Sequence, residues 1–191
     1  MQGKTDFPLP ANLPRPVDDG AADHLKNARV PAILLESTAG RTVDLSRRSA
    51  PRTVIYCYPM TGVPGKALPE GWDMIPGARG CTPQTCGFRD LHREFSLLSA
   101  EVFGLSTQAS EYQREMAQRL GLPFEVLSDC YFEFCDALQL PAFEVEGTRL
   151  LKRLALIICD GRIERVFYPV FPPNESAAEV LRWLRENPLT K

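Results

Sequence analysis

Residues 52–58, Arg-Thr-Val-Ile-Tyr-Cys-Tyr, are the stretch from which the fold of this chain can be deduced. β-Branched and aromatic residues dominate it, and they favour the extended backbone of a strand. Pro51 and Pro59 stand directly before and after it. Because proline has no N–H to donate to a sheet, these two residues limit a regular strand. We therefore expect a central strand over residues 52–58.

A long loop and then a helix should follow this strand. Residues 60–80 contain five glycines and three prolines, and a long loop in a compact domain is often functional. Thr82 can then cap a helix, and Pro83 suits its first position. Apolar residues at helical spacing predict one apolar face, made of Phe88, Leu91, Phe95 and Leu98.

The remaining segments alternate between strand-like and helix-like patterns. An N-terminal β-hairpin is expected from residues 32–36 and 42–45. Further strands are expected at 101–106, 124–127, 154–159 and 162–168, the last two joined by a turn at Asp160-Gly161. Further helices are expected at 110–120, 131–138 and 175–185. This order predicts an α/β fold in which helices flank a central mixed sheet.

The N-terminal segment differs from the rest in composition. Proline fixes its own φ and lacks a donor, so residues 1–28 are expected to form an extended Pro-rich arm. Its prolines are Pro8, Pro10, Pro14 and Pro16. A single domain over residues 29–191 remains, which suits a chain of 191 residues.

Charge and hydropathy argue against several kinds of partner. The formal net charge of −2 provides no basic field for phosphates, so nucleic acid is not expected as a partner. Apolar runs such as 154–159 are too short to span a bilayer, and no membrane partner is expected. Residues 1–6 have no apolar stretch behind their charge, so we expect no secretory signal and a cytoplasmic location.

The chain has six cysteines and two histidines. In a reducing cytoplasm the cysteines are not expected to form structural disulfides, so each is a buried hydrophobe, a metal ligand or a redox thiol. Cys57 and Cys159 fall in expected strands and are interpreted as core residues. With only two histidines, a His-based metal site or a Ser–His hydrolase is not expected.

Cys81 lies where the long loop becomes a helix. The first N–H groups of a helix are unpaired and the helix dipole is positive there, so a thiol at this place loses its proton more easily. The thiolate is the nucleophilic form. On position alone, the alternative is a cysteine that only fills space at a helix start.

Cys86 follows five residues later. In a regular helix the two cysteines would lie about 7.5 Å apart along the axis and on different faces. A disulfide requires Cα atoms within about 7 Å of each other. The bond can therefore form only if the first turns of the helix unwind, which predicts a helix in the reduced state and a loop in the oxidised state.

Cys130 and Cys135 repeat this spacing, with aromatic residues between them. A packed segment is the plainer interpretation, because cysteine is often a core residue. A sharper alternative is a structural zinc site, for which two pairs of thiolates lie within the observed range of spacings. Its ligands would be Cys81, Cys86, Cys130 and Cys135.

The segment around the first pair resembles the signature of the peroxiredoxins, most closely the Q-type (bacterioferritin comigratory protein) branch. The residues that match it are Gly80-Cys81-Thr82 and Cys86-Gly87-Phe88-Arg89-Asp90. Further segments are similar in order and spacing, at Val54–Pro59, Gly104–Thr107, Leu127–Asp129 and Arg153–Ile158. The resemblance runs from about Val30 to about Asn187, which is most of the chain.

The resemblance implies a thioredoxin-like fold and an atypical 2-Cys thiol peroxidase that reduces hydrogen peroxide and organic hydroperoxides without metal or organic cofactor. It implies that Cys81 is the peroxidatic thiol and that Cys86 closes an intramolecular disulfide with it. Arg153 would hold the thiolate and polarise the peroxide, with Arg149 and Lys152 as nearby rivals. An external dithiol, thioredoxin or a glutaredoxin, would reduce the disulfide, and the protein would be a monomer or a homodimer.

One feature departs from the family's pattern, Pro-x-x-x-Thr-x-x-Cys, because Ala78 stands where the threonine is expected. Residues 58–63 resemble the displaced motif, separated from the cysteine by an insertion. We hypothesise that the loop folds back and that Thr61 supplies the hydroxyl; the alternative is an ordinary turn residue. The insertion carries Trp72 and Met74, which suit either a pocket wall or a partner surface.

Three other functions compete with the peroxidase. A thiol–disulfide oxidoreductase on the same fold prefers Cys-x-x-Cys, which this chain lacks. A non-catalytic, zinc-stabilised binding module would contain the metal that the peroxidase does not need. A chaperone-like or regulatory protein could keep the fold and have lost the peroxidase activity, since the usual threonine is displaced.

Overall fold

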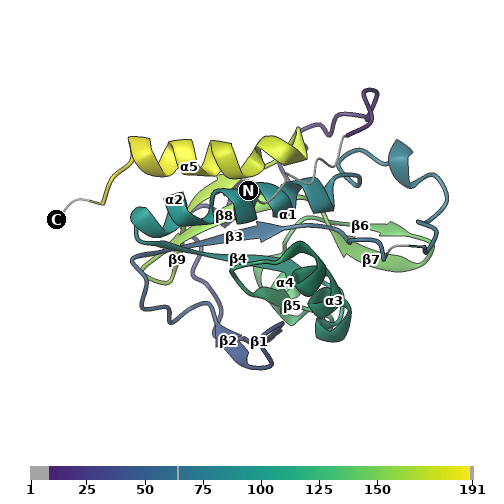
Figure 1. Ribbon diagram of the computed structural model, residues 1–191. Helices are drawn as coiled ribbons and strands as arrows, with labels where there is room; N and C mark the ends of the chain where they lie inside the picture. Colours follow the sequence, from purple (N-terminus) through teal and green to yellow (C-terminus); the bar gives the residue numbers. More distant parts are fainter. Residues whose placement is uncertain (1–8, 64, 190–191) are drawn as a thin grey trace, which may run out of the picture.

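The computed structural model describes residues 9–63 and 65–189 and has a seven-stranded mixed sheet at its centre (Figure 1). The strand order is β2-β1-β5-β4-β3-β8-β9. The strands span Leu34–Ser37 (β1), Thr42–Asp44 (β2), Arg52–Cys57 (β3), Ala100–Ser106 (β4), Val126–Ser128 (β5), Leu154–Cys159 (β8) and Arg162–Phe167 (β9). This architecture confirms the α/β fold with a central mixed sheet and the N-terminal hairpin of β1 and β2.

The expected central strand is confirmed. All six residues of β3 are buried, and β3 pairs in parallel with β4 and antiparallel with β8. Cys57, at the end of β3, is registered with Leu105 on one side and Leu154 on the other. The last residues of β3 and β4 and the first residue of β8 therefore meet at one edge of the sheet.

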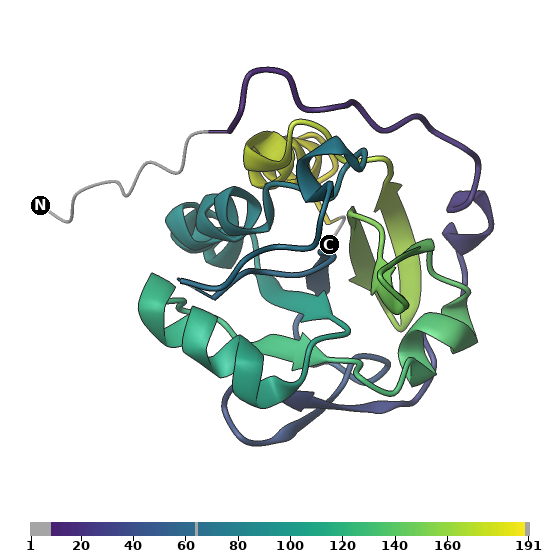
Figure 2. The same cartoon turned by 90° about the vertical axis from the view of Figure 1, so that its right-hand side faces the viewer.

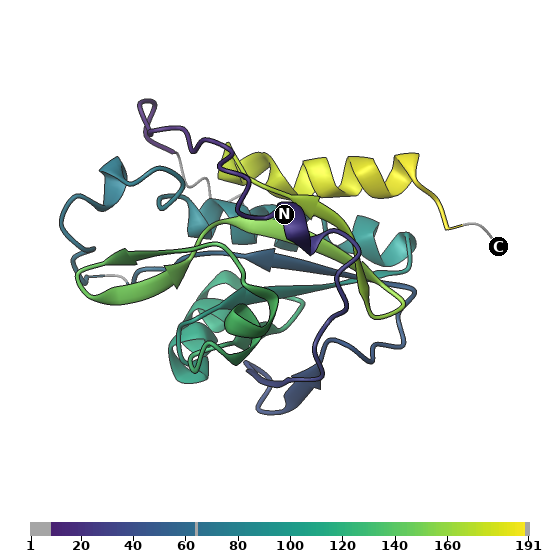
Figure 3. The same cartoon turned by 180° about the vertical axis from the view of Figure 1, so that it is seen from behind.

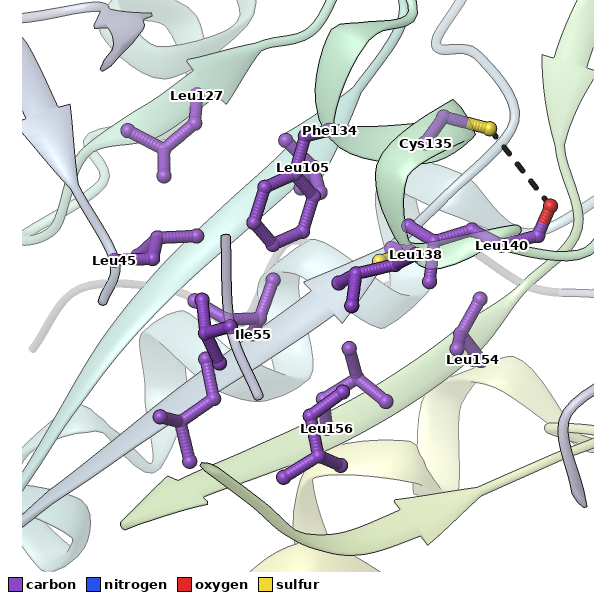
Figure 4. Packing of buried hydrophobic residues seen from close by; sticks show 14 of the residues in the cluster. Leu45, Ile55, Leu105, Leu127, Phe134, Cys135, Leu138, Leu140, Leu154 and Leu156 are labelled. Atoms are coloured by element: carbon purple, nitrogen blue, oxygen red, sulfur yellow. Dashed lines mark hydrogen bonds between the residues drawn. The ribbon is translucent and has the colours of Figure 1, made fainter. Parts of the chain in front are cut away.

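Helices cover both faces of the sheet. They span Cys81–Asp90 (α1), His92–Leu97 (α2), Ser110–Leu120 (α3), Glu133–Leu138 (α4) and Ser176–Glu186 (α5). Figure 1 shows α1, α2 and α5 on one side and α4 on the other. Under α1, Phe88 stacks on Tyr56 of β3 at 4.4 Å. On the opposite face, Phe134 and Leu138 of α4 pack over the sheet residues drawn in Figure 4.

One pair of strands was not expected from the sequence. Residues Ala142–Val145 (β6) and Thr148–Leu151 (β7) form a separate two-stranded sheet. Its turn at Glu146-Gly147 has positive φ at both residues, which is typical of a tight hairpin. Each strand has only four residues and lies outside the main sheet. The sequence therefore lacks the long alternation of apolar and polar residues that predicts a strand.

The helix after the insertion begins two residues earlier than predicted. Gly80 is its N-cap, with φ of 107°, and no side chain caps the helix, so the expected cap at Thr82 is wrong. A Cβ on Gly80 would lie 2.3 Å from Pro173 Cγ, a distance that real atoms do not reach. A close approach at positive φ requires glycine, and this requirement fixes where α1 starts.

The described part of the arm, from Leu9 onward, runs round the outside of the domain (Figures 2 and 3). Asp19 accepts hydrogen bonds from Lys152 Nζ at 2.5 Å and from the Tyr168 hydroxyl at 2.7 Å. A 3₁₀ turn over Asp23–Leu25 then places Leu25 in the core with no exposed surface. Residues 1–8 of the expected arm lie outside the described residues, and the division at residue 29 stays a prediction.

No helix among the described residues has both the length and the apolar character needed to cross a membrane.

Candidate active site

The predicted site residues lie together at the edge of the sheet where β3, β4 and β8 meet. Arg153 directly precedes β8, and the loop that carries Thr61 leaves β3 at the same edge. Cys81, the first residue of α1, returns to this edge after the insertion. Residues that are far apart in the sequence thus converge because β8 runs antiparallel to β3.

Cys81 and Arg153 are in direct contact. The Nη2 group of Arg153 donates to Cys81 Sγ at 3.2 Å, and the Cys81 thiol lies 3.6 Å from the carbonyl of Ala78. Both side chains are nearly buried, with 4% of Cys81 and 3% of Arg153 exposed. A buried guanidinium at this distance and the positive end of α1 both stabilise a thiolate.

The Arg153 guanidinium is itself held in place by acceptors around it. Its Nη1 donates to Gln84 Oε1, and its Nη2 donates to the carbonyls of Ala78 at 3.1 Å and Arg79 at 3.3 Å. Gln84 is fully buried and was not identified from the sequence. The available signal was its spacing, because a residue three positions after Cys81 on a helix lies on the same face.

The rival cations lie elsewhere. Arg149 pairs with Asp136 at 2.7 Å and donates to Cys135 Sγ at 3.5 Å. Lys152 pairs with Asp19 on the arm. Of these three cations, Arg153 is the one that donates to Cys81 Sγ.

Thr61 lines the same pocket as Cys81, which has a volume of about 410 Å³. Its main chain is held firmly: the N–H donates to Gln108 Oε1 at 2.9 Å, and the carbonyl accepts from Gln108 Nε2 at 3.1 Å and from the Tyr112 hydroxyl at 2.8 Å. The Thr61 hydroxyl also donates to Gln108 Oε1, at 3.4 Å. The loop therefore folds back to the site, while the hydroxyl of Thr61 bonds Gln108 in this state.

The sequence profile of the Redoxin family matches residues 25–181. The chain belongs to the Redoxin family.

Named relatives of this Redoxin chain are Q-type peroxiredoxins. It is 29% identical over 160 residues to peroxiredoxin Q, chloroplastic, of Sedum lineare, covering 84% of this chain and 77% of that protein. It is 29% identical over 166 residues to peroxiredoxin Bcp of Escherichia coli (strain K12), covering 82% of this chain and 93% of that protein. These relatives confirm the resemblance to the Q-type branch and favour a thiol-dependent peroxidase over the competing functions.

Solved structures agree on the fold of this Redoxin domain. Peroxidoxin BcpB of Mycobacterium tuberculosis superposes with a TM-score of 0.69 at 24% identity, covering 85% of this chain and 97% of that one. Peroxiredoxin Q of Xanthomonas campestris superposes with a TM-score of 0.66 at 20% identity, covering 93% and 97%. At these identities the superpositions establish the thioredoxin-like fold, and they carry no residue role.

Cys86 lies in the middle of α1 and has 6% of its surface exposed. Burial raises the pKa of its thiol above the ordinary value, so this group stays protonated at neutral pH while α1 is folded. Cys81 and Cys86 are both free thiols in this structure. The reduced helix predicted from their spacing is the state observed.

The other four cysteines differ in burial, and Cys130, expected in a packed segment, is half-buried. Cys57 is fully buried in β3, as expected, whereas Cys159 is only half-buried because it ends β8 next to an exposed turn. Cys135 is buried in α4, where burial raises the pKa of its thiol to about 11. Across residues 9–63 and 65–189, no three His, Cys, Asp or Glu side chains come close enough to hold a metal, which argues against the zinc alternative.

Proposed function

We propose that Cys81 is the peroxidatic thiol of this Redoxin protein. Its thiolate attacks one peroxide oxygen, so that an S–O bond forms while the O–O bond breaks. The sulfur is oxidised to a sulfenic acid, and the leaving oxygen takes up a proton and departs as water or an alcohol. The contact of Arg153 Nη2 with Cys81 Sγ at 3.2 Å is the single observation that carries this assignment.

Arg153 is proposed to act on both the attacking sulfur and the leaving oxygen. Its fixed guanidinium stabilises the attacking thiolate, and it donates to the negative charge that develops on the leaving oxygen. Gln84 and the two carbonyls keep the guanidinium oriented before the peroxide arrives. Preorganised donors of this kind need no rearrangement during the reaction, which is why they lower the barrier.

Cys86 is proposed to resolve the sulfenic acid. Its sulfur bonds to Cys81 Sγ and water leaves, but only after the first turns of α1 unwind. The sequence of α1 supports such unwinding, because Gly87 and two threonines have low helix propensity. Unwinding also exposes Cys86, which removes the burial that raises the pKa of its thiol.

Recycling of the disulfide is proposed to use an external dithiol, thioredoxin or a glutaredoxin, by thiol–disulfide exchange. A cytoplasmic location, in which thiols are kept reduced, belongs to the same proposal. The functional unit is proposed to be a monomer or a homodimer of the domain over residues 29–191.

The intramolecular disulfide has a direct test. One equivalent of hydrogen peroxide is added to the reduced protein, and the products are mapped by mass spectrometry after alkylation. We expect a bond between Cys81 and Cys86, while the buried Cys57 and Cys135 stay unmodified. An unmodified thiol at Cys81 after this treatment would remove the assignment.

The role of Thr61 is a separate proposal. Its hydroxyl is proposed to turn from Gln108 to the reacting sulfur and peroxide when substrate enters the shared pocket. Thr61→Val removes the hydroxyl and keeps the shape, so the rate constant for Cys81 oxidation should fall by about tenfold to a hundredfold, the usual cost of one hydrogen bond to a charged group. Thr61→Ser, which keeps the hydroxyl, is the matched control and should retain most of the rate. Equal rates for the valine variant and the unaltered protein would leave Thr61 as a turn residue.

A further inference from the structure

A second pocket, which we call the arm pocket, adjoins the active site at Arg153. Its volume is about 240 Å³, and it shares no lining residue with the pocket at Cys81. The arm, the end of the insertion, strand β6 and the chain segments before β8 and after β9 enclose it. Since one water takes about 30 Å³ of the liquid, this space can hold several waters or one small organic molecule.

Most of the lining of the arm pocket is apolar. Its apolar residues include Pro16, Ile75, Phe143 and Val170. Pro16 of the arm lies 3.6 Å from where a Cβ on Gly77 would be, so the arm packs directly against the insertion here. Such walls stabilise an apolar body in the pocket, because binding removes that body from water.

Two cations, Lys152 and Arg153, line the same pocket. The ammonium of Lys152 donates to Asp19, and because an ammonium has three donors it can serve a further acceptor. The acceptors around Arg153 are the amide oxygen of Gln84, two main-chain carbonyls and the sulfur of Cys81. Within the described part of the chain, the buried positive charge of Arg153 therefore meets no carboxylate.

The Nε–H of Arg153 is the one donor of this side chain that the active site leaves unused. It is buried and has no hydrogen-bond partner among residues 9–63 and 65–189, whereas Nη1 and Nη2 both donate. Buried donors in native proteins nearly always have a partner, which is a protein group, a water or a ligand. Because Arg153 lines the arm pocket, an acceptor bound there can supply the missing partner.

We propose that the arm pocket binds a small carboxylate that carries an apolar body, such as an arylacetate. The carboxylate accepts from Arg153 Nε and Lys152 Nζ, and the apolar body lies against Ile75 and Phe143. A phosphate fits less well, because most of its oxygens would face apolar walls without donors.

This ligand shares the guanidinium of Arg153 with the Cys81 thiolate. A carboxylate beside the cation compensates part of its charge, so that binding weakens the stabilisation of the thiolate, and the thiolate in turn weakens binding. The binding site itself is independent of the proposed peroxidase function. Its effect on the peroxide reaction rests on that function.

Binding is measured directly by isothermal titration calorimetry of the reduced full chain with phenylacetate. We expect saturable binding with a Kd below about 1 mM. Phenylacetamide has the same shape and no charge, and it should bind at least about tenfold more weakly, because hydrogen bonds to a charged acceptor are the stronger ones. Equal affinities for the two compounds, or no saturable heat with phenylacetate, would overturn the proposal.

Variants show whether the ligand occupies the arm pocket. Ile75→Trp fills the space and should abolish phenylacetate binding. Met74→Trp is the matched control, because Met74 is the neighbouring residue with 75% of its surface exposed, and it should leave the Kd within about twofold.

A second pair of variants keeps the test valid if Ile75→Trp disturbs the insertion. Lys152→Met removes one of the two donors and should raise the Kd by about threefold to tenfold. Arg149→Met removes a neighbouring cation that does not line the pocket and should leave the Kd unchanged. Unchanged affinity in both Ile75→Trp and Lys152→Met would place the ligand elsewhere and overturn the proposal.

The effect on Cys81 is measured by the rate at which iodoacetamide alkylates its thiol, followed by mass spectrometry of the Cys81 peptide. Saturating phenylacetate should slow this reaction by about threefold to tenfold in the unaltered protein and have no effect in Ile75→Trp. Slowing that persists in Ile75→Trp would mean that the ligand blocks the pocket at Cys81, which would overturn the coupling. If peroxide fails to oxidise Cys81 while phenylacetate still binds as expected, the proposed function fails and the binding site stands.

Discussion

Cys81→Ser should abolish peroxide consumption. A serine hydroxyl is not ionised at neutral pH and cannot take the oxygen from a peroxide, so the rate should fall by at least about three orders of magnitude. Arg153 and the start of α1 would remain in place around the new side chain, because serine is nearly isosteric with cysteine. The measurement is the consumption of hydrogen peroxide or cumene hydroperoxide with an excess of a chemical dithiol.

Cys86→Ser is the matched variant for this experiment, since it removes the second thiol of the same helix. It should leave one turnover intact and trap the sulfenic acid on Cys81, which a dimedone adduct detected by mass spectrometry will reveal. The two variants separate attack from resolution. If Cys81→Ser retained full activity, or if Cys86→Ser prevented the first turnover, the assigned roles would be wrong.

Arg153→Met should reduce the rate constant for Cys81 oxidation by about a hundredfold to a thousandfold. This range is the usual cost of removing one preorganised donor from a developing oxyanion. The variant also leaves Gln84 buried without the cation that it now faces, so a loss of stability is expected in addition. Stopped-flow oxidation of the reduced protein with each peroxide measures the rate constant.

Two further variants show whether the effect is specific to Arg153. Arg153→Lys keeps the charge but not the fork that reaches both Cys81 and Gln84, so it should give an intermediate rate. Arg149→Met removes the neighbouring guanidinium, which contacts Cys135 instead, and should leave the peroxide rate within about twofold. A loss as large for Arg149→Met as for Arg153→Met would mean that general positive charge, rather than one positioned donor, drives the reaction.

Local patterns predicted the regular elements well. The helix α3 begins and ends at the residues expected from its periodicity, and the Glu115–Arg119 pair on it has a distance of 2.8 Å. The buried strand β3 was readable because proline limits it and its composition is uniform. These features depend on neighbours within a few positions, which is the information that a single sequence carries.

Features that depend on distant contacts were not readable in the same way. Gly80, rather than Thr82, starts α1 because of Pro173, which lies more than ninety positions away in the sequence. Gln84 became recognisable as part of the site only once Arg153 was placed beside it. The sequence favoured Arg153 over Arg149 only by its spacing to the strand that follows. The physical reason is that β8 starts at Leu154 and runs antiparallel to β3, which places Arg153 beside the end of β3.

The antiparallel pairing of β3 with β8 has a consequence for biosynthesis. Cys57 faces Leu154 across this ladder, so the guanidinium next to Leu154 meets the sulfur of α1 only when nearly the whole chain has been made. A shorter nascent chain would expose both thiols of α1 as ordinary cysteines, because it lacks the charged partner that speeds their reaction with peroxide. Reactivity is therefore acquired late, together with the closing of the long loop between β3 and β8. A ribosome-bound fragment that ends before residue 153 should be no more sensitive to oxidants than an unfolded peptide.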